Sequence, residues 1–316
     1  MPSAQIQQAQ AASDKIASGF VFALLGAVGF SAKAIIVKLA YRHGTDAVTL
    51  LMYRMLFALP LFVLMAWWAG RGRPRLTGRE RLGVLALGVT GYYLASLLDF
   101  EGLRYISAGL ERLILYLNPT LVMLLGRIVY GRGIRWGQLL GMAISYCGVV
   151  LVFGLEAHVQ GAHVAWGTLL VLLSALSYAV YLVHSDALVR QLGALRLVGL
   201  ASTVACLCCL LHFALTRPLA AAVVATPVLW LSLLNATLCT AAPILLMMMA
   251  IERIGASAAA QIGMVGPIST IFMGVWLLDE PFTPWMAAGT ALVVGGIFVC
   301  TRAARRAAGA TGAARR

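Results

Sequence analysis

ILYLNPTLVMLLG (residues 114–126) and IGMVGPISTIFMG (residues 262–274) are two apolar segments in which a proline and a glycine occupy matching positions. Pro119 and Pro267 lie 148 residues apart, and so do Gly126 and Gly274. The same offset relates further pairs: Ala108 and Ala256, Gly141 and Gly289, Gly148 and Gly296, Gly19 and Gly167, and Leu24-Leu25 and Leu172-Leu173. Since no gap is needed through the last two apolar runs of each half, the matches indicate an internal duplication.

The composition is that of a membrane protein. Hydrophobic residues make up 61% of the chain and charged residues 11%, with a mean hydropathy of +0.91. Soluble domains average roughly 45–50% apolar and about 25% charged residues. A soluble enzyme, a disordered protein, a collagen and a disulfide scaffold are therefore excluded. The net charge of +13 does not predict nucleic-acid binding, because the basic residues lie in short gaps between apolar runs instead of clustering.

The apolar runs have the length that a helix needs to cross a hydrocarbon core about 30 Å thick, which is about 20 residues. We predict an all-α polytopic membrane protein of about ten transmembrane helices: 18–40, 47–69, 82–103, 106–129, 137–155, 167–189, 196–216, 227–249, 256–278 and 284–302. Residues 1–17 are expected to form a loose polar tail and residues 303–316 a basic tail. The first run is not a signal peptide, because no basic segment precedes it and it continues through Lys33.

The distribution of lysine and arginine predicts that both termini are cytoplasmic. With that orientation the outer segments carry only Lys38, Arg42, Arg104 and Arg217. The inner segments carry the residues at positions 15, 71, 73, 75, 79, 81, 127, 132, 135, 190, 196, 253, 302, 305, 306, 315 and 316. The loop from Glu156 to Ala165 contains neither lysine nor arginine and is expected outside.

The two halves, residues 18–155 and 167–302, each contain five predicted spans. Because five is odd, the second half must enter the membrane from the opposite side. Inverted repeats of this kind are the usual architecture of secondary transporters, since they let one scaffold open to either side.

The repeated segments resemble the EamA family of the drug/metabolite transporter superfamily. In the first half the resemblance rests on residues 106–110, Asn118, Pro119, Gly131, residues 138–141 and Gly148. In the second half it rests on residues 255–258, Gly266, Pro267, residues 278–280, residues 288–289 and residues 295–296. The resemblance implies ten helices, a central cavity between the halves, and export of amino acids, related metabolites or drugs. The Gly-Glu pair that is usual in the family reads Asp279-Glu280 in one half and Gly131-Arg132 in the other.

The two prolines predict a substrate cavity, because interrupted helices at matching positions mark transporter sites. Proline donates no hydrogen bond, so the carbonyls of Leu115 and Gly263 are freed and must face protein, water or ligand. A plain helix kink is the alternative. The candidate cavity residues are Tyr116, Asn118, Pro119, Gln261, Gly263, Met264 and Pro267.

Charged residues inside predicted spans are the second set of candidates, since each costs roughly 2.5–3.5 kcal/mol on the insertion scale. They are Lys33, Arg54, Asp99, Glu111 and Arg112, and the positions 148 residues later hold Tyr181, Ser202, Met247, Ala259 and Ala260. We expect Lys33 and Arg54 to pair with Glu111 or Asp99. Either carboxylate is a candidate for proton exchange that couples transport to the proton gradient, and a structural ion-pair network is the alternative.

The sequence therefore predicts a secondary transporter of the plasma (inner) membrane that exports small molecules by alternating access. The expected partners are the lipid bilayer, a small-molecule substrate and protons, but no nucleic acid, and a monomer suffices for a complete pathway. No cofactor or metal is expected, because Walker A, Rossmann and HExxH motifs are absent and all six cysteines lie in apolar runs. Two other classes stay open: an integral-membrane enzyme acting on a lipid-linked substrate, and a non-transporting membrane sensor.

Overall fold

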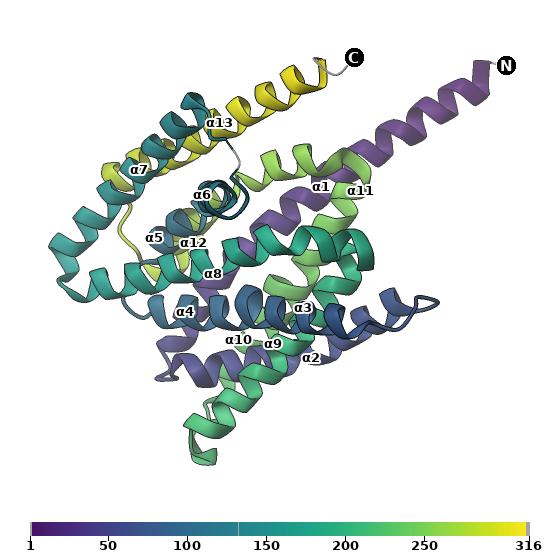
Figure 1. The fold of residues 1–316 in the computed structure, drawn as a ribbon. Helices are drawn as coiled ribbons and strands as arrows, with labels where there is room; N and C mark the ends of the chain where they lie inside the picture. The colour runs from purple at the N-terminus through teal and green to yellow at the C-terminus, as the bar shows by residue number, and fades with distance from the viewer. Residues whose placement is uncertain (1, 132, 314–316) are drawn as a thin grey trace.

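A computed structural model describes residues 2–131 and 133–313, and within these ranges every regular element is a helix (Figure 1). Side chains are described for residues 16–131, 133–159, 161–185, 187–255, 258–259 and 262–303. The α-helices are α1 Pro2–Tyr41, α2 Ala47–Gly70, α3 Gly78–Gly88, α4 Ala95–Gly102, α5 Ala108–Leu115, α6 Asn118–Tyr130, α7 Trp136–Gln160, α8 His163–Leu192, α9 Ala194–Thr216, α10 Thr226–Ala236, α11 Ala242–Gly263, α12 Gly266–Leu278 and α13 Pro284–Ala313. Two π-helical segments, η1 Val89–Leu94 and η3 Thr237–Ala241, and one 3-10 turn, η2 Leu219–Ala222, complete the list.

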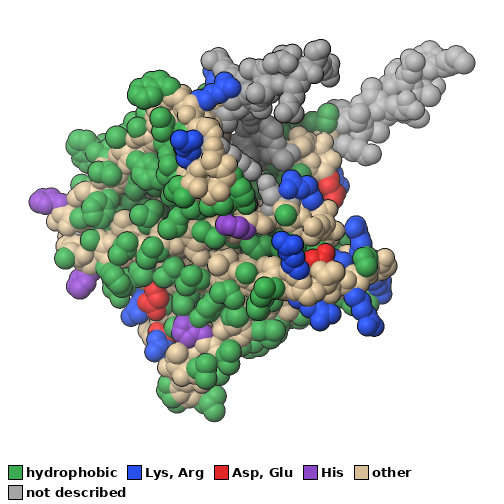
Figure 2. Space-filling model, viewed as in Figure 1, with side chains coloured by type: hydrophobic (Ala, Val, Ile, Leu, Met, Phe, Trp, Pro, Cys, Tyr) green, Lys and Arg blue, Asp and Glu red, His purple; other side chains and the backbone are tan. Residues whose placement is uncertain are grey.

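The predicted all-α membrane fold is confirmed. Among the described residues, nine helices are long and apolar enough to cross a membrane, and Gly266–Leu278 is a shorter apolar helix. The predicted span 256–278 is not one helix, because it follows a break at Gly255 and is interrupted again before α12. Large apolar side chains such as Trp67, Trp68 and Trp276 are exposed, and Figure 2 shows hydrophobic side chains over much of the viewed face. Such a surface fits contact with lipid.

The two tails and one loop differ from the expectation. The helix α1 begins at Pro2, so residues 2–17 extend the first span instead of forming a loose tail. No glycine or proline stands between Ser3 and Ser18 to end the helix there. Likewise α13 continues to Ala313 through most of the basic tail, and α7 continues to Gln160. Glu156, which we expected in an outer loop, therefore lies within a helix.

Helix boundaries recur at the offset found in the sequence. The helices α3 and α10 begin 148 residues apart, at Gly78 and Thr226, and the π segments begin at Val89 and Thr237. The same holds for α6 and α12 and for α7 and α13. The helices α6 and α12 end at residues with left-handed backbone, Gly131 (φ 64°) and Asp279 (φ 59°). The two halves thus share details of backbone geometry that periodicity alone does not specify.

Contacts between the halves also occur in equivalent pairs. The first-half helix α1 packs along α11 and α12, while its counterpart α8 packs along α4 and α6. The counterparts α2 and α9 pack on each other, and so do α7 and α13. In the α7–α13 pair, Gly141 lies against Gly296 and Gly148 against Gly289. These reciprocal contacts describe an approximate two-fold relation between the halves.

Both ends of the chain lie at the same end of the helix bundle (Figure 1). The opposite end, which we call the distal end, carries the loops between residues 41 and 47, 102 and 108, 160 and 163, 216 and 226, and 278 and 284. The loop after α1 leads into α2 through Asp46, whose carboxylate accepts from the backbone N–H of Val48 at 3.0 Å and of Thr49 at 3.3 Å. Aspartate is one of the residues preferred at a helix N-cap.

Candidate functional site

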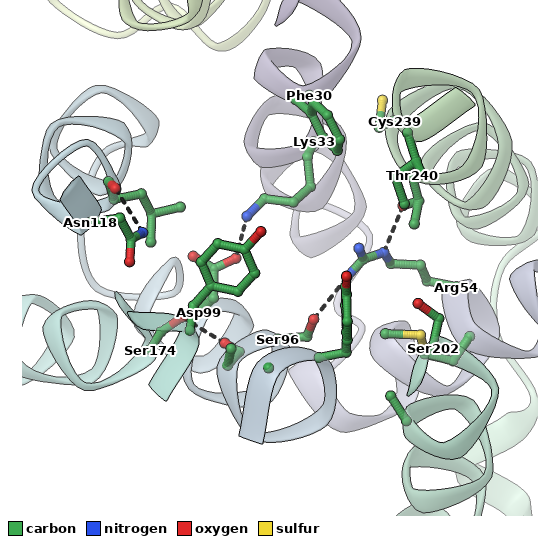
Figure 3. A pocket seen from close by; sticks show the side chains of 18 of the residues that line it. Phe30, Lys33, Arg54, Ser96, Asp99, Asn118, Ser174, Ser202, Cys239 and Thr240 are labelled. Atoms are coloured by element: carbon green, nitrogen blue, oxygen red, sulfur yellow. Dashed lines mark hydrogen bonds and ion pairs between the residues drawn. The ribbon is translucent and has the colours of Figure 1, made fainter. Parts of the chain in front are cut away.

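A cavity of about 360 Å³ lies between the two halves and is lined by side chains from both of them (Figure 3). The first half contributes charged and amide groups from α1, α2, α4, α5 and α6. The second half contributes mainly hydroxyl, thiol and aromatic groups from α8, α9 and η3. The polar and aromatic lining residues are Phe30, Lys33, Arg54, Phe62, Tyr92, Ser96, Asp99, Arg112, Tyr116, Asn118, Ser174, Tyr178, Ser202, Cys239 and Thr240.

Lys33 joins two buried carboxylates. Its Nζ lies 2.5 Å from Asp99 Oδ2 and 3.1 Å from Glu111 Oε1. Asp99 is 3% exposed and Glu111 is fully buried. The expected pairing of Lys33 is therefore confirmed with both partners. One ammonium thus faces two carboxylates away from bulk water.

Arg54 does not form the ion pair that we expected. Its guanidinium is buried and donates from Nε to Thr240 Oγ1 at 3.1 Å and from Nη1 to Ser96 Oγ at 3.5 Å. The guanidinium carbon lies 5.2 Å from the centre of the Phe100 ring. Within the part of the chain that the structure describes, no carboxylate is within ion-pair distance of this group. Asp99 and Glu111 instead share Lys33.

Arg112, on α5, also lines this cavity. Its Nη2 donates to Ser31 Oγ at 3.2 Å, and its guanidinium carbon lies 5.3 Å from the centre of the Tyr116 ring. Ser31 Oγ in turn donates to the Gly266 carbonyl at 2.9 Å, so Arg112 is linked to the second broken helix.

Both carbonyls that the prolines release find protein donors. Asn118 Nδ2 donates to the Leu115 carbonyl at 2.8 Å, and the Tyr116 hydroxyl donates to the Gly263 carbonyl. The second bond crosses from one half to the other. Tyr116 and Asn118 therefore combine the two roles that the sequence left open, since they hold the helix breaks together and also line the cavity.

Four other residues proposed from the prolines, Pro119, Gly263, Met264 and Pro267, are not among the described residues that line the cavity. Pro119, Gly263 and Pro267 shape the backbone of the breaks. Met264 instead lines an apolar groove between α12 and α13. The side chain of Gln261 lies outside the described residues.

Sequence reasoning missed the contribution of the π-helical segments. Gly91 and Tyr92 in η1, and Cys239 and Thr240 in η3, line the cavity at equivalent positions of the two halves. The wider turn of a π-helix is often found at functional sites. Val89 and Thr237 stand 148 residues apart, so the repeat places the two segments at equivalent positions. Neither segment contains a proline that would have indicated irregular helix geometry.

Sequence reasoning also missed a polar network that joins the two halves at the distal end. The network consists of Lys38, Arg42, Ser107, Glu156, Asp279 and Glu280, and it borders a second cavity of about 540 Å³. Glu280 Oε1, from the second half, lies 3.7 Å from Lys38 Nζ and accepts from the Ala108 N–H at 2.9 Å. Lys38 Nζ also donates to the Ile106 carbonyl at 2.6 Å. Glu280 thus links α1 and the start of α5 to the end of α12.

The remaining members of this distal network reinforce the link. Arg42 Nη2 donates to the Leu278 carbonyl at 2.6 Å and lies 3.8 Å from Asp279 Oδ2. Glu156 accepts hydrogen bonds from the N–H and the hydroxyl of Ser107, which caps α5. The family resemblance draws attention to Glu280, but the sequence does not indicate that Lys38 and Ala108 would be its partners.

Comparison with known proteins agrees with this architecture. The profile of the EamA-like transporter family matches residues 17–154 and 165–302. The uncharacterized transporter YcbK of Bacillus subtilis is 34% identical over 282 residues, covering 84% of this chain and 86% of YcbK. A probable terminal-alkyne amino-acid exporter of Streptantibioticus cattleyicolor is 25% identical over 273 residues, covering 83% of this chain and 88% of the exporter.

A solved crystal structure has the same overall fold. It superposes with a TM-score of 0.62 at 21% sequence identity, over 92% of this chain and 98% of the other. At this identity the likeness concerns the fold alone.

Proposed function

The chain belongs to the EamA-like transporter family, and on this premise we propose that it is a secondary transporter that exports amino acids, related small metabolites or drugs across the plasma (inner) membrane. The observation that carries the proposal is the buried, charged cavity between the two halves. Charged side chains are costly within a bilayer and usually serve a substrate or ion pathway. The family and its relatives are named as transporters and not as enzymes, which disfavours a membrane enzyme.

The proposed mechanism is alternating access between the two halves. In support, α5 packs against α12 at the distal end, where the distal network also joins the halves. Away from that contact, the two broken helices pack on different partners, with α6 against α8 and α12 against α1. They thus converge at the distal end and diverge toward the termini. If both termini are cytoplasmic, this is the form that receives a substrate for export.

Coupling to protons is assigned to Asp99 or Glu111. Both carboxylates share Lys33, so adding a proton to one of them would weaken its hold on the ammonium and change the charge of the cavity wall. A group entering the cavity could then exchange with the proton. The two carboxylates are candidates of equal standing, since each contacts the same Nζ.

Reconstitution tests the transport function. Purified protein in liposomes is loaded with a panel of labelled amino acids and small drugs, and efflux is followed with and without a pH gradient. We expect protein-dependent efflux of at least one class, accelerated by the gradient. Absence of movement for every compound, with protein that remains monodisperse and folded, would contradict transport and favour the sensor.

The coupling assignment has its own test. A protein with Glu111→Gln together with Asp99→Asn keeps both side-chain shapes but cannot exchange protons there. We expect substrate exchange without a gradient to survive, while acceleration by the pH gradient is lost. Intact gradient-driven transport in this double variant would remove both carboxylates from the coupling step.

A further inference from the structure

Arg54 and Arg112 are two guanidinium groups of the cavity that form no ion pair among the described residues, and Arg54 is the one held by neutral hydroxyls of both halves. It lies on α2, is 7% exposed, and faces the cavity opposite Lys33 (Figure 3). Its partners are two neutral hydroxyls, Thr240 Oγ1 and Ser96 Oγ. The nearest acids are engaged by Lys33. The guanidinium is thus positioned by its neighbours but not neutralised by them.

The charge balance of the cavity points the same way. Three cations, Lys33, Arg54 and Arg112, surround two carboxylates, Asp99 and Glu111. One positive charge is therefore left over within a buried site, where an uncompensated ion is costly. A guanidinium presents paired N–H donors whose spacing matches a carboxylate, which makes a carboxylate the natural occupant.

Buried acceptors without donors give a second, independent indication of a ligand. Asp99 Oδ1 and Asn118 Oδ1 have no hydrogen-bond partner, and neither does the hydroxyl of Ser202. Asp99 and Ser202 are 3% and 2% exposed, and all three side chains line the cavity. Buried polar atoms in proteins normally have partners, so these acceptors call for an N–H or ammonium group. The aromatic rings of Phe30 and Tyr178 complete an otherwise apolar wall.

We propose that Arg54 binds the carboxylate of the transported molecule and selects compounds that carry both a carboxylate and an amino group over amines that lack the carboxylate. The inference rests on the proposed transport function and narrows its substrate class. The amino group lies toward Asp99 and Asn118, and an apolar body fills the aromatic part of the cavity. Thr240 and Ser96 act as positioning residues, because they hold the guanidinium from two sides.

The test uses matched compounds in proteoliposomes with the full-length chain. L-Phenylalanine and L-leucine are each compared with their amides, which keep the amino group and side chain but lack the carboxylate. A carboxylate bound by a guanidinium predicts efflux of the acids at least about tenfold faster than of the amides. Equal or faster efflux of the amides from the wild-type protein would overturn the inference without any variant.

Variants then locate the preference. We expect Arg54→Gln to bring the acid-to-amide ratio close to one, and Arg54→Lys to retain part of it. Arg112→Gln removes the same charge from another wall and tests whether charge alone is responsible. A preference that survives in Arg54→Gln, or that disappears only in Arg112→Gln, would contradict the assignment to Arg54.

Folding is controlled independently. If Arg54→Gln does not remain folded in detergent, Thr240→Val removes the Nε partner while keeping the guanidinium, and it should reduce the ratio. An unchanged ratio in Thr240→Val, with Arg54→Gln unfolded, would count against the inference. Efflux of the amides but not of the acids would overturn the inference and leave the transport function intact. Efflux of none of the four compounds would overturn the inference as well, and the transport function would then be tested with the wider panel of amino acids and drugs.

Discussion

In the first half of the chain, Lys33, Asp99 and Glu111 form one buried ion cluster, whereas the second half has Tyr181, Met247 and Ala259 at the positions 148 residues later. Helix boundaries elsewhere in the halves nevertheless recur at this offset, as at the starts of α3 and α10, of α6 and α12, and of α7 and α13. The backbone of each half is therefore specified by features that the halves share, namely apolar runs, breaks and small residues. The second half adopts its fold without these charges. Because the charges occur in one half, one wall of the cavity is charged and the other is lined by uncharged side chains.

The largest effect is expected from breaking the ion cluster. Replacing Lys33 by methionine leaves two buried carboxylates without their cation, which should destabilise the protein by about 3–5 kcal/mol. The matched change in the second half, Tyr181→Phe, removes only a hydroxyl contact of 3.1 Å with Tyr92 and should cost about 0.5–1.5 kcal/mol. Thermal unfolding of the purified proteins in one detergent compares the two directly.

A variant that removes the whole ion cluster is the control for that experiment. Combining Lys33→Met with Asp99→Asn and Glu111→Gln leaves no unpaired charge in the cluster and should recover part of the lost thermal stability, because Arg54 and Arg112 remain as cations without an acid in the cavity. If the triple variant is as unstable as Lys33→Met alone, packing and not charge explains the loss. Similar effects of Lys33→Met and Tyr181→Phe would show that the halves are not distinguished by this cluster.

The seam between α7 and α13 should instead behave symmetrically. A Cβ at Gly148 would lie 2.6 Å from the Gly289 carbonyl oxygen, and a Cβ at its counterpart Gly296 would collide with Ser145 and Gly141. Leucine at either position should separate the helices at a cost of about 1–3 kcal/mol or more. Gly154→Leu is the control in α7, because a Cβ there meets nothing within 4 Å. Unequal melting temperatures for the Gly148 and Gly296 variants would contradict the two-fold relation.

The sequence was sufficient for those features that depend on local pattern. Runs of apolar residues located the spans. Asp46 and Thr283 are of the residue types preferred at helix N-caps, and Thr283 Oγ1 accepts from the Met286 N–H at 3.2 Å. The prolines located the helix breaks. Lys33 could be paired with Asp99 and Glu111 because a buried cation in a membrane needs an anion.

The features that sequence reasoning missed depend on which helices meet. Arg54 meets the hydroxyl of Thr240 from the other half instead of an acid, a contact that spacing along the chain does not reveal. Glu280 meets Lys38 and Ala108 only because α12 ends beside the start of α5. The loose N-terminal tail was wrong for a local reason, since polarity was taken as a sign of disorder where alanine and glutamine support a helix.

A smaller difference between the halves concerns how α2 and its counterpart α9 begin. Asp46 caps α2 and lies 3.1 Å from Arg217, whereas Gly193 precedes α9 without a side-chain cap. Although partial burial raises the pKa of Asp46, its bonds to Thr49 and the Arg217 charge outweigh that effect and lower it. Asp46→Ala should therefore cost about 1 kcal/mol at neutral pH.

The pH dependence of this cap follows from the direction of the shift. Because the pKa of Asp46 is lower in the folded than in the unfolded state, the contribution is complete above the unfolded value of about 3.9 and is lost as the pH falls through the folded value. The difference in melting temperature between wild type and Asp46→Ala should thus be constant from pH 7 to 5 and shrink below about pH 4. A difference that is unchanged at pH 3 would argue that the variant acts by some other route than the carboxylate.

The smallest effect is expected where α6 and α12 end. Gly131 (φ 64°) and Asp279 (φ 59°) both adopt left-handed backbone, which glycine tolerates without cost and other residues do not. Gly131→Ala should destabilise by about 1 kcal/mol, whereas Asp279→Gly should stabilise by up to about 1 kcal/mol, less any loss of the exposed contact of Asp279 with Arg42. Opposite shifts in melting temperature would show that α6 and α12 end in the same left-handed turn, which is occupied by glycine in one half and by aspartate in the other. Asp279→Gly could instead lower the melting temperature as much as Gly131→Ala does. In that case the contact of Asp279 with Arg42 stabilises the protein by more than the left-handed backbone of Asp279 destabilises it, and the turn in the second half serves to hold the distal network.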